Sequence, residues 1–130
     1  MKINLKKKIS EIFTIKGEKF FRNIEEKITL KILKQKQKVV VSLGGGAFLN
    51  KNIQKEILNN HISFWLYCDE KTLIQRIKSS SNRPIASNLT NHELTNLIKK
   101  RSNIYSKALY KIDCNKHTKI KIANKIINYL

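Results

Sequence analysis

Acidic residues are scarce in this chain of 130 residues, where 9 Asp and Glu stand against 27 Lys and Arg and leave a net charge of +18. A basic excess of this size is found in proteins that bind nucleic acids or anionic surfaces. Nearly all of the basic residues are lysines, however, and they run through every segment instead of forming one stripe. With many Ile and Asn residues beside them, this is the composition that A/T-rich codons produce. We therefore favour a compositional bias, and a basic nucleic-acid-binding module remains the alternative function.

Cysteine, proline and long apolar runs are also scarce. The two cysteines, Cys68 and Cys114, lie far apart in the sequence, which gives neither the spacing of a metal site nor a disulfide framework. Each closes a short apolar run, so we expect buried free thiols and a reducing, cytoplasmic location. No apolar run approaches the length of a membrane span, and the N-terminal residues lack the apolar region of a signal peptide. With one Pro and no linker-like stretch, the chain is expected to form a single domain over 1–130.

Helical and strand-like segments alternate along the rest of the chain. Amphipathic periodicity predicts helices, the first two separated by Gly17, at 9–15, 18–36, 50–60, 70–78, 90–107 and 118–130. Asp69 is a predicted N-cap, and Thr90 with Glu93 forms a predicted capping box. Short apolar runs predict strands at 38–43, 62–68 and 110–114, and the Ser- and Asn-rich stretch 79–88 predicts a mobile loop. This alternation is typical of an α/β fold with a parallel sheet.

A run of three glycines, Gly44-Gly45-Gly46, follows the first predicted strand directly and precedes a predicted helix. Ligands of such sheets bind beyond the C-terminal ends of the strands, and glycine lets backbone N–H groups approach a ligand closely. Taken alone, the run is read more simply as a tight strand-to-helix turn. It is not a phosphate-binding P-loop, because no Gly-Lys-Ser/Thr follows it.

Arginine is used at only four positions in a chain that otherwise takes its positive charge from lysine. Arginine offers a planar fork that grips a carboxylate or phosphate with two hydrogen bonds, which lysine cannot do. Arg22 and Arg101 lie in predicted helices and Arg83 lies in the predicted loop, whereas Arg76 is better read as part of a solvated helix face. Three such arginines beside a glycine turn and a loop predict a site for a small anionic molecule under a lid.

Ordered motifs give a more specific indication. The chain carries Glu11-Ile12-Phe13, Gly17-Glu18, Phe21-Arg22 and Glu25-Glu26, then Val40-Val41-Ser42-Leu43-Gly44-Gly45-Gly46-Ala47, then Arg83-Pro84, and finally Arg101 with Ile104-Tyr105. From about residue 9 to its end, the chain resembles the C-terminal part of a shikimate kinase. In that family these segments read E-I-F-x-x-x-G-E-x-x-F-R-x-x-E, a strand with its glycine turn, a lid Arg-Pro, and R-x-x-L-Y.

The resemblance implies a role for each matched residue. Arg22 and Arg101 are expected to clamp the carboxylate of shikimate. Gly44, Gly45 and Gly46 are expected to present backbone donors to the substrate. Arg83 is expected to move in with the lid at 79–88, to contact ATP, and to act in catalysis by neutralising the transferring phosphoryl group. Glu18 and Glu25 are either orienting partners of the arginines or solvated helix residues. No metal ligand is expected among these residues.

The departures from the family pattern are at the N-terminal side. The 130 residues contain no G-x-x-x-x-G-K-S/T loop and no Asp-x-Asp strand. The fold class that the resemblance implies is therefore a three-layer, P-loop kinase-like α/β parallel sheet that is incomplete, lacking the central P-loop strand. We expect an N-terminally truncated shikimate kinase, a phosphotransferase of aromatic amino-acid biosynthesis, with this chain inactive by itself.

The resemblance also implies the cofactors and partners. ATP and Mg²⁺ are expected, although their main ligands in the family are missing from this chain. Shikimate is the expected substrate, no specific nucleic acid or membrane partner is expected, and the complete protein is expected to be a monomer. Another small-molecule P-loop kinase is the alternative within enzymes, and the Phe-Arg, triple-Gly and Arg-Pro set makes it the weaker one.

Overall fold

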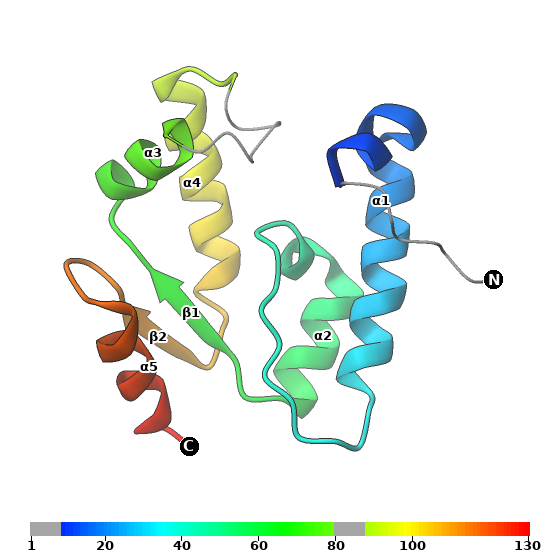
Figure 1. Cartoon of the computed structure of the whole chain (residues 1–130), viewed down its shortest axis with the longest axis vertical. Helices are drawn as coiled ribbons and strands as arrows, with labels where there is room; N and C mark the ends of the chain where they lie inside the picture. Colours follow the sequence, from blue (N-terminus) through cyan, green and yellow to red (C-terminus); the bar gives the residue numbers. More distant parts are fainter. Residues whose placement is uncertain (1–8, 80–87) are drawn as a thin grey trace. The chain divides into compact units, whose positions relative to one another are not determined.

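The computed structural model describes residues 9–79 and 88–130. The chain divides into two compact units, one ending at Ile57 and the other running from Leu58 to Leu130. Figure 1 shows the helices and strands of both units with their labels. The expectation of one partial domain stays a prediction.

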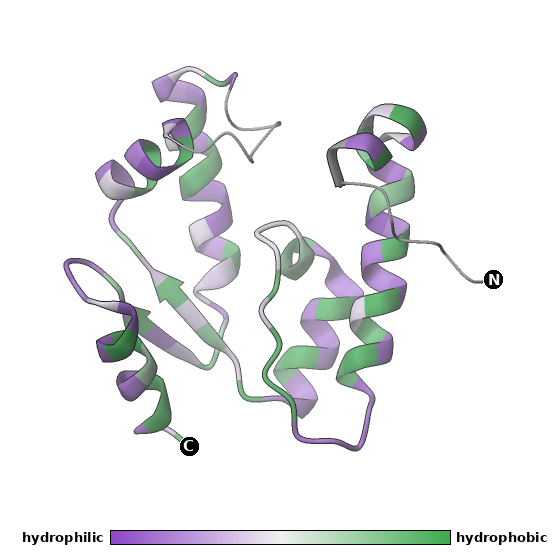
Figure 2. Cartoon of the chain, viewed as in Figure 1, coloured by the Kyte–Doolittle hydropathy of each residue, from purple (hydrophilic) through white to green (hydrophobic). Residues whose placement is uncertain are grey.

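The first unit is built on helix α1, Ile9–Leu33. At Gly17 the backbone leaves the helical region (φ 80°, ψ 166°), so the helix is kinked there. This conformation is open essentially to glycine alone. The prediction of two helical segments separated by Gly17 is thus confirmed. Along α1, hydrophobic and hydrophilic residues alternate in bands (Figure 2), the pattern of a helix with one packed face.

The strand predicted at 38–43 is wrong, because these residues have no regular secondary structure. Val40 is 99% exposed and Val39 is 51% exposed. A β-branched run becomes a strand only when another strand satisfies its backbone N–H and C=O groups, and no described residue pairs with this one. Strand propensity alone did not determine the structure here.

After the glycine run, the chain forms the short 3-10 helix η1, Ala47–Leu49, and then helix α2, Lys51–Asn60. Ala47, Phe48, Ile53 and Ile57 are buried and form the apolar side of these elements. Helix α1 contacts η1. The core of the first unit therefore lies where the segment after the glycine run meets α1.

The second unit holds a two-stranded parallel sheet of β1, Phe64–Tyr67, and β2, Tyr110–Asp113. The register pairs Phe64 with Tyr110 and Tyr67 with Asp113. The prediction of parallel strands at 62–68 and 110–114 is confirmed. The sheet's core is formed by Ile112 with the two cysteines, Cys68 and Cys114, which are buried free thiols as expected. Burial raises the pKa of the Cys114 thiol.

Three helices accompany this sheet: α3, Glu70–Lys78; α4, Asn91–Tyr105; and α5, Lys119–Ile127. Helix α3 packs on α4, and α5 packs on β2. The predicted N-cap of α3 is present, with the Asp69 side chain accepting a hydrogen bond from Thr72 N. The predicted capping box of Thr90 and Glu93 is also present at the start of α4. No helix in the described ranges is long and apolar enough to cross a membrane.

Aromatic side chains line both faces of the β1–β2 sheet. On one face the rings of Phe64, Tyr110 and Tyr129 lie within 4.4–6.1 Å of one another, centroid to centroid. On the other, Trp65 and Tyr67 meet edge to face at 5.2 Å, and Lys111 Nζ lies 3.8 Å from the Tyr67 ring centroid. Strand residues alternate between faces, so each strand contributes to both clusters.

Candidate functional site

Arg22 on α1 is held by two aromatic rings and a carboxylate. Its Cζ lies 5.3 Å from the ring centroid of Phe21 and 6.0 Å from that of Phe13. Its Nη1 donates to Glu25 Oε2 at 2.6 Å, and the Glu25 side chain is only 16% exposed. A short, charge-assisted bond of this kind fixes the guanidinium plane. Of the two roles that the sequence left open for Glu25, the structure shows the orienting one.

Glu18 contacts the opposite edge of the same guanidinium more loosely. Its Oε1 lies 3.4 Å from both Nε and Nη2 of Arg22, and its side chain is 59% exposed. Exposed ion pairs of this length contribute little to stability. An incoming anion could therefore replace Glu18 at the Nε–Nη2 edge of Arg22.

The glycine run lies directly against this guanidinium. A Cβ added at Gly46 would stand 2.6 Å from Arg22 Cζ and 2.7 Å from Nη2, far inside van der Waals contact. A Cβ added at Gly44 would stand 3.6 Å from Glu25 Oε1, which is an ordinary contact. Any larger residue at position 46 would displace the Arg22 guanidinium, although the backbone conformation does not call for glycine, since its φ and ψ are −99° and −20°.

Backbone hydrogen bonds fold the glycine run into η1. Gly44 O accepts from Ala47 N at 3.0 Å, and Gly46 O accepts from Leu49 N at 3.2 Å. The run forms a turn, as its simpler interpretation predicts. It also lets the Arg22 side chain approach the backbone of Gly46 closely, as its ligand-binding interpretation requires. The structure therefore brings together two of the predicted substrate-binding elements, Arg22 and Gly44–Gly46.

The remaining predicted residues do not share that unit. Arg101 lies on α4 in the second unit, and Arg83 lies outside the described residues together with most of the predicted lid at 79–88. Arg76 is exposed on α3, as expected, with its Nη1 3.4 Å from Cys68 Sγ. The position of Arg101 relative to Arg22 is left as a prediction.

Arg101 nevertheless has an unusual environment. Its Nε is buried and has no hydrogen-bond partner within residues 9–79 and 88–130. A buried donor without a partner costs roughly 1–3 kcal/mol, and native structures rarely leave such a group unexplained. An anionic ligand would supply the missing acceptor.

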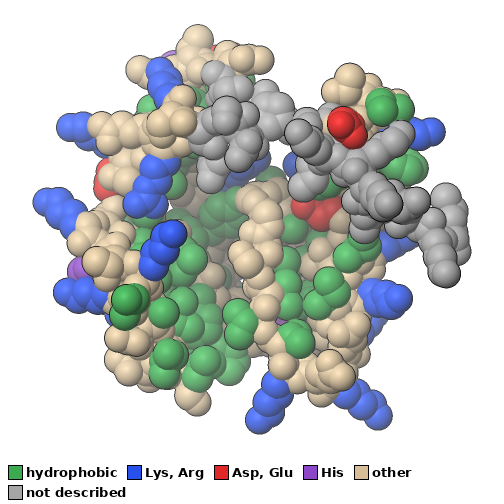
Figure 3. Space-filling model, in the orientation of Figure 1, with side chains coloured by type: hydrophobic (Ala, Val, Ile, Leu, Met, Phe, Trp, Pro, Cys, Tyr) green, Lys and Arg blue, Asp and Glu red, His purple; other side chains and the backbone are tan. Residues whose placement is uncertain are grey.

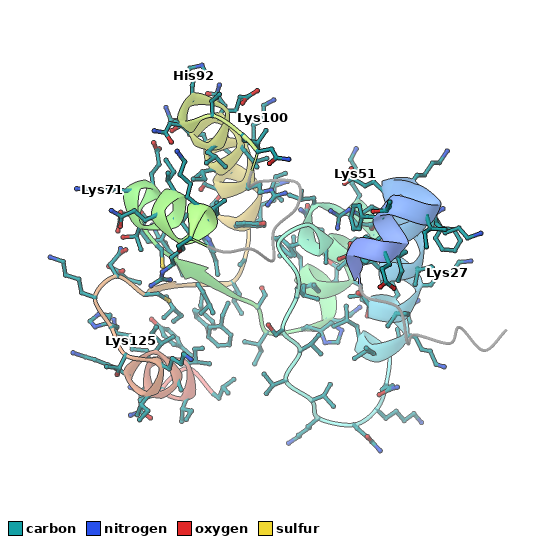
Figure 4. The ribbon with its side chains drawn as sticks, turned by 45° about the horizontal axis from the view of Figure 1, so that its top comes forward. Lys27, Lys51, Lys71, His92, Lys100 and Lys125 are labelled. Carbon is teal, nitrogen blue, oxygen red and sulfur yellow. The ribbon has the colours of Figure 1, made fainter. Side chains whose placement is uncertain are left out.

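The lysines of residues 9–79 and 88–130 come from many elements. On the face drawn in Figure 3, Lys and Arg side chains project at separate points of both units. The five lysines labelled in Figure 4 come from five different helices: Lys27, Lys51, Lys71, Lys100 and Lys125. This distribution agrees with a compositional bias and not with a nucleic-acid-binding stripe.

The described residues also test the fit of the expected Mg²⁺. Among them, no group of three or more His, Cys, Asp or Glu side chains is placed to hold a metal ion. Mg²⁺ binds through oxygen ligands, commonly one or two carboxylates together with substrate phosphates. No residue described here is therefore assigned to Mg²⁺.

One tertiary contact near Arg22 had no signal in the sequence. Glu26, one residue after the carboxylate that anchors Arg22, accepts hydrogen bonds from the side chains of Asn50 and Asn52. The partners lie 24 and 26 residues away, so neither periodicity nor local spacing points to them.

Comparisons with known proteins agree on one family. The family model described as "Shikimate kinase" matches residues 2–130. A shikimate kinase of Bartonella henselae is 35% identical over 92% of this chain, and one of Thermodesulfovibrio yellowstonii is 35% identical over the same share. A solved shikimate kinase from Acinetobacter baumannii, in complex with shikimate, superposes with a TM-score of 0.82 at 27% identity, over 93% of this chain and 68% of that one.

The matched length differs among these relatives. The chain spans 57% of the Bartonella henselae protein and 69% of the Thermodesulfovibrio yellowstonii protein. The fold likeness confirms the α/β, P-loop kinase-like fold class, of which the described residues show the parallel pair β1–β2. On the match over nearly its whole length, the chain belongs to the shikimate kinase family.

Proposed function

We propose that this chain provides the shikimate-binding side of a shikimate kinase, a phosphotransferase that uses ATP to phosphorylate a hydroxyl group of shikimate. The observation that carries the proposal is the close approach of the Arg22 guanidinium to Gly46. This contact places a carboxylate-binding fork against the turn that is expected to offer backbone donors. The shikimate bound by the Acinetobacter baumannii relative supports the same substrate for this chain.

Binding of the shikimate carboxylate at Arg22 follows from the two edges of the guanidinium. Glu25 keeps Nη1 through its 2.6 Å bond. The substrate carboxylate displaces the exposed Glu18 and forms two parallel bonds to Nε and Nη2, which a fork geometry favours over the single oxygen of Glu18 at 3.4 Å. Glu25 thereby orients the arginine without competing for the substrate.

Arg101 is the second proposed ligand of the carboxylate. Its Nε is buried without a hydrogen-bond partner, which supports a role in which the substrate carboxylate accepts a hydrogen bond from it. Arg83, the proposed ATP contact and catalytic arginine, would neutralise charge on the transferring phosphoryl group. ATP supplies that phosphoryl group, and no step of the proposal is assigned to Mg²⁺.

A cytoplasmic location is proposed with this function. The two cysteines are free and buried side by side at the ends of paired strands, which fits a compartment that keeps thiols reduced.

Calorimetric titration of shikimate into the chain tests the proposal. The Arg22→Lys and Arg101→Lys variants are each expected to lose about 1.5–3 kcal/mol of binding free energy, because lysine cannot form the paired bonds. This loss corresponds to roughly 10- to 150-fold in affinity. Arg76→Lys removes an arginine of the same chain that lies outside the proposed site, and it should bind shikimate as the unmodified chain does. Absence of shikimate binding by the unmodified chain, or equal affinity in all four proteins, contradicts the proposal.

A further inference from the structure

Both carboxylate oxygens of Glu26 are engaged across the first unit. Oε2 accepts from Asn50 Nδ2 and Oε1 accepts from Asn52 Nδ2, each at 2.7 Å. Glu26 is only partly exposed, and these two bonds hold its pKa below its ordinary value, the bond from Asn52 more strongly. The carboxylate therefore stays ionised at neutral pH, when it accepts both bonds and donates none.

Asn50 is itself held in a single orientation by α2. Its Oδ1 accepts from Asn52 N at 2.9 Å and from Ile53 N at 3.1 Å, which caps the first turn of the helix. Because its oxygen faces the helix, its NH₂ group must face away from it, toward Glu26. The negative charge of Glu26 also lies at the N-terminus of α2, where the helix dipole favours an anion.

The segment that begins with the glycine run thus contacts α1 at two points. Arg22 and Glu26 are four residues apart on α1 and lie on one side of it, one turn from each other. Arg22 meets the run at Gly46, and Glu26 holds Asn50, which directly follows η1. Only three residues of η1 separate these two attachment points.

We propose that Glu26 is a positioning residue for the shikimate carboxylate, acting through Asn50 and Asn52 to set the distance between Arg22 and the glycine run. The inference rests on the proposed function, because it assumes that substrate meets both Arg22 and this run. Without the tie, η1 moves relative to α1, and the guanidinium and the backbone donors no longer face one carboxylate together. A misplacement of about 1 Å can cost roughly 100-fold in a reaction that depends on the placement.

Two variants of equal net charge test this role. Glu26→Ala removes the acceptor of both Asn50 and Asn52. In Glu26→Gln, the amide oxygen still accepts from Asn50, and the side-chain amide of Asn52 can turn so that its oxygen accepts from the new NH₂ group. Both variants remove one negative charge, but only Glu26→Gln keeps the two ties to Asn50 and Asn52.

Shikimate affinity is measured by calorimetry for the unmodified chain and both variants. We expect Glu26→Ala to bind roughly fivefold or more weakly, the value of one hydrogen bond or more, and Glu26→Gln to stay within about twofold of the unmodified chain. Because both variants lose the same negative charge, a purely electrostatic effect on an anion would strengthen binding equally in both. Equal affinities in the two variants, or an affinity of Glu26→Ala equal to that of the unmodified chain, overturn the inference.

A ligand-free measurement separates this inference from the proposed function. In heteronuclear NMR spectra, the amide signals of Gly44–Gly46 and the Nε–H signal of Arg22 are expected to shift in Glu26→Ala and to stay close to their original positions in Glu26→Gln. If the unmodified chain does not bind shikimate, the proposed function fails, and these signals still decide the positioning role. Signals that stay in place in Glu26→Ala refute it, whatever the ligand.

Discussion

The Gly46→Ala substitution probes the closest contact of the proposed site. The new methyl carbon would stand 2.6 Å from Arg22 Cζ, whereas carbon atoms in contact are normally about 3.5–4.0 Å apart. The guanidinium must therefore retreat by about 1 Å or more, since the backbone of η1 is tied by its own hydrogen bonds. This retreat breaks the alignment of Arg22 with the turn and strains its 2.6 Å bond to Glu25.

The cost is expected in binding and not in folding. The backbone angles of Gly46 lie in the right-handed helical region, where alanine is unstrained, and the displaced atoms are the end of a flexible side chain. Loss of the paired charged bonds from Arg22 to the substrate would cost about 1.5–3 kcal/mol. We therefore predict a fall in shikimate affinity of roughly 10- to 150-fold, with a thermal midpoint close to that of the unmodified chain.

Gly44→Ala is the matched control, because it adds the same methyl group two residues earlier at an ordinary 3.6 Å contact. Isothermal titration calorimetry with shikimate gives the affinity, and far-UV circular dichroism gives the thermal midpoint. If Gly46→Ala binds shikimate as tightly as Gly44→Ala and the unmodified chain do, Arg22 does not bind substrate from its place against the turn.

Two further predictions follow from the carboxylates. Glu25→Ala removes the anchor of Arg22 and should weaken shikimate binding roughly tenfold. Glu18→Ala removes a competitor for the guanidinium edge that the substrate would use, so this variant should bind shikimate at least as tightly as the unmodified chain. Calorimetry measures both affinities, and the opposite order would contradict the two roles. At the cap of α3, hydrogen bonds from the Thr72 backbone N–H, and less strongly from its hydroxyl, hold the pKa of Asp69 below its ordinary value. The carboxylate therefore stabilises the folded chain above about pH 5, and this stabilisation is lost as the pH falls through the folded-state pKa. The difference in thermal midpoint between the unmodified chain and Asp69→Ala should therefore be largest near neutral pH and shrink in acid, and a difference that grows in acid would contradict it.

Features that depend on neighbouring residues could be predicted from the sequence. The kink at Gly17, the cap at Asp69 and the capping box at Thr90 are all decided within one helical turn, so local chemistry determined them. The segment at 38–43 shows the opposite case, because a strand depends on a partner elsewhere in the chain.

The same distinction applies to the site. The Arg22–Glu25 bond joins residues three apart on a helix, and the motif made it one of two open interpretations. The ties from Glu26 to Asn50 and Asn52 cross from one helix to another, and only the fold brings them together. The close approach of Arg22 to Gly46 is likewise a tertiary contact, which the glycine run permits but does not specify.

The aromatic clusters on the β1–β2 sheet have a consequence for spectroscopy. The single tryptophan and all four tyrosines lie in the second unit, whereas the aromatic residues of the first unit are all phenylalanines. Tryptophan emission and near-ultraviolet dichroism therefore report on Trp65 and its neighbours, and the first unit is almost silent in both. Far-ultraviolet dichroism, in contrast, has a large contribution from α1, whose 25 residues form the longest helix described. Because α3, α4 and α5 also contribute to far-ultraviolet dichroism, a transition seen by that probe and not by tryptophan emission would report the first unit. Coincident transitions would show that the two units unfold as one cooperative body.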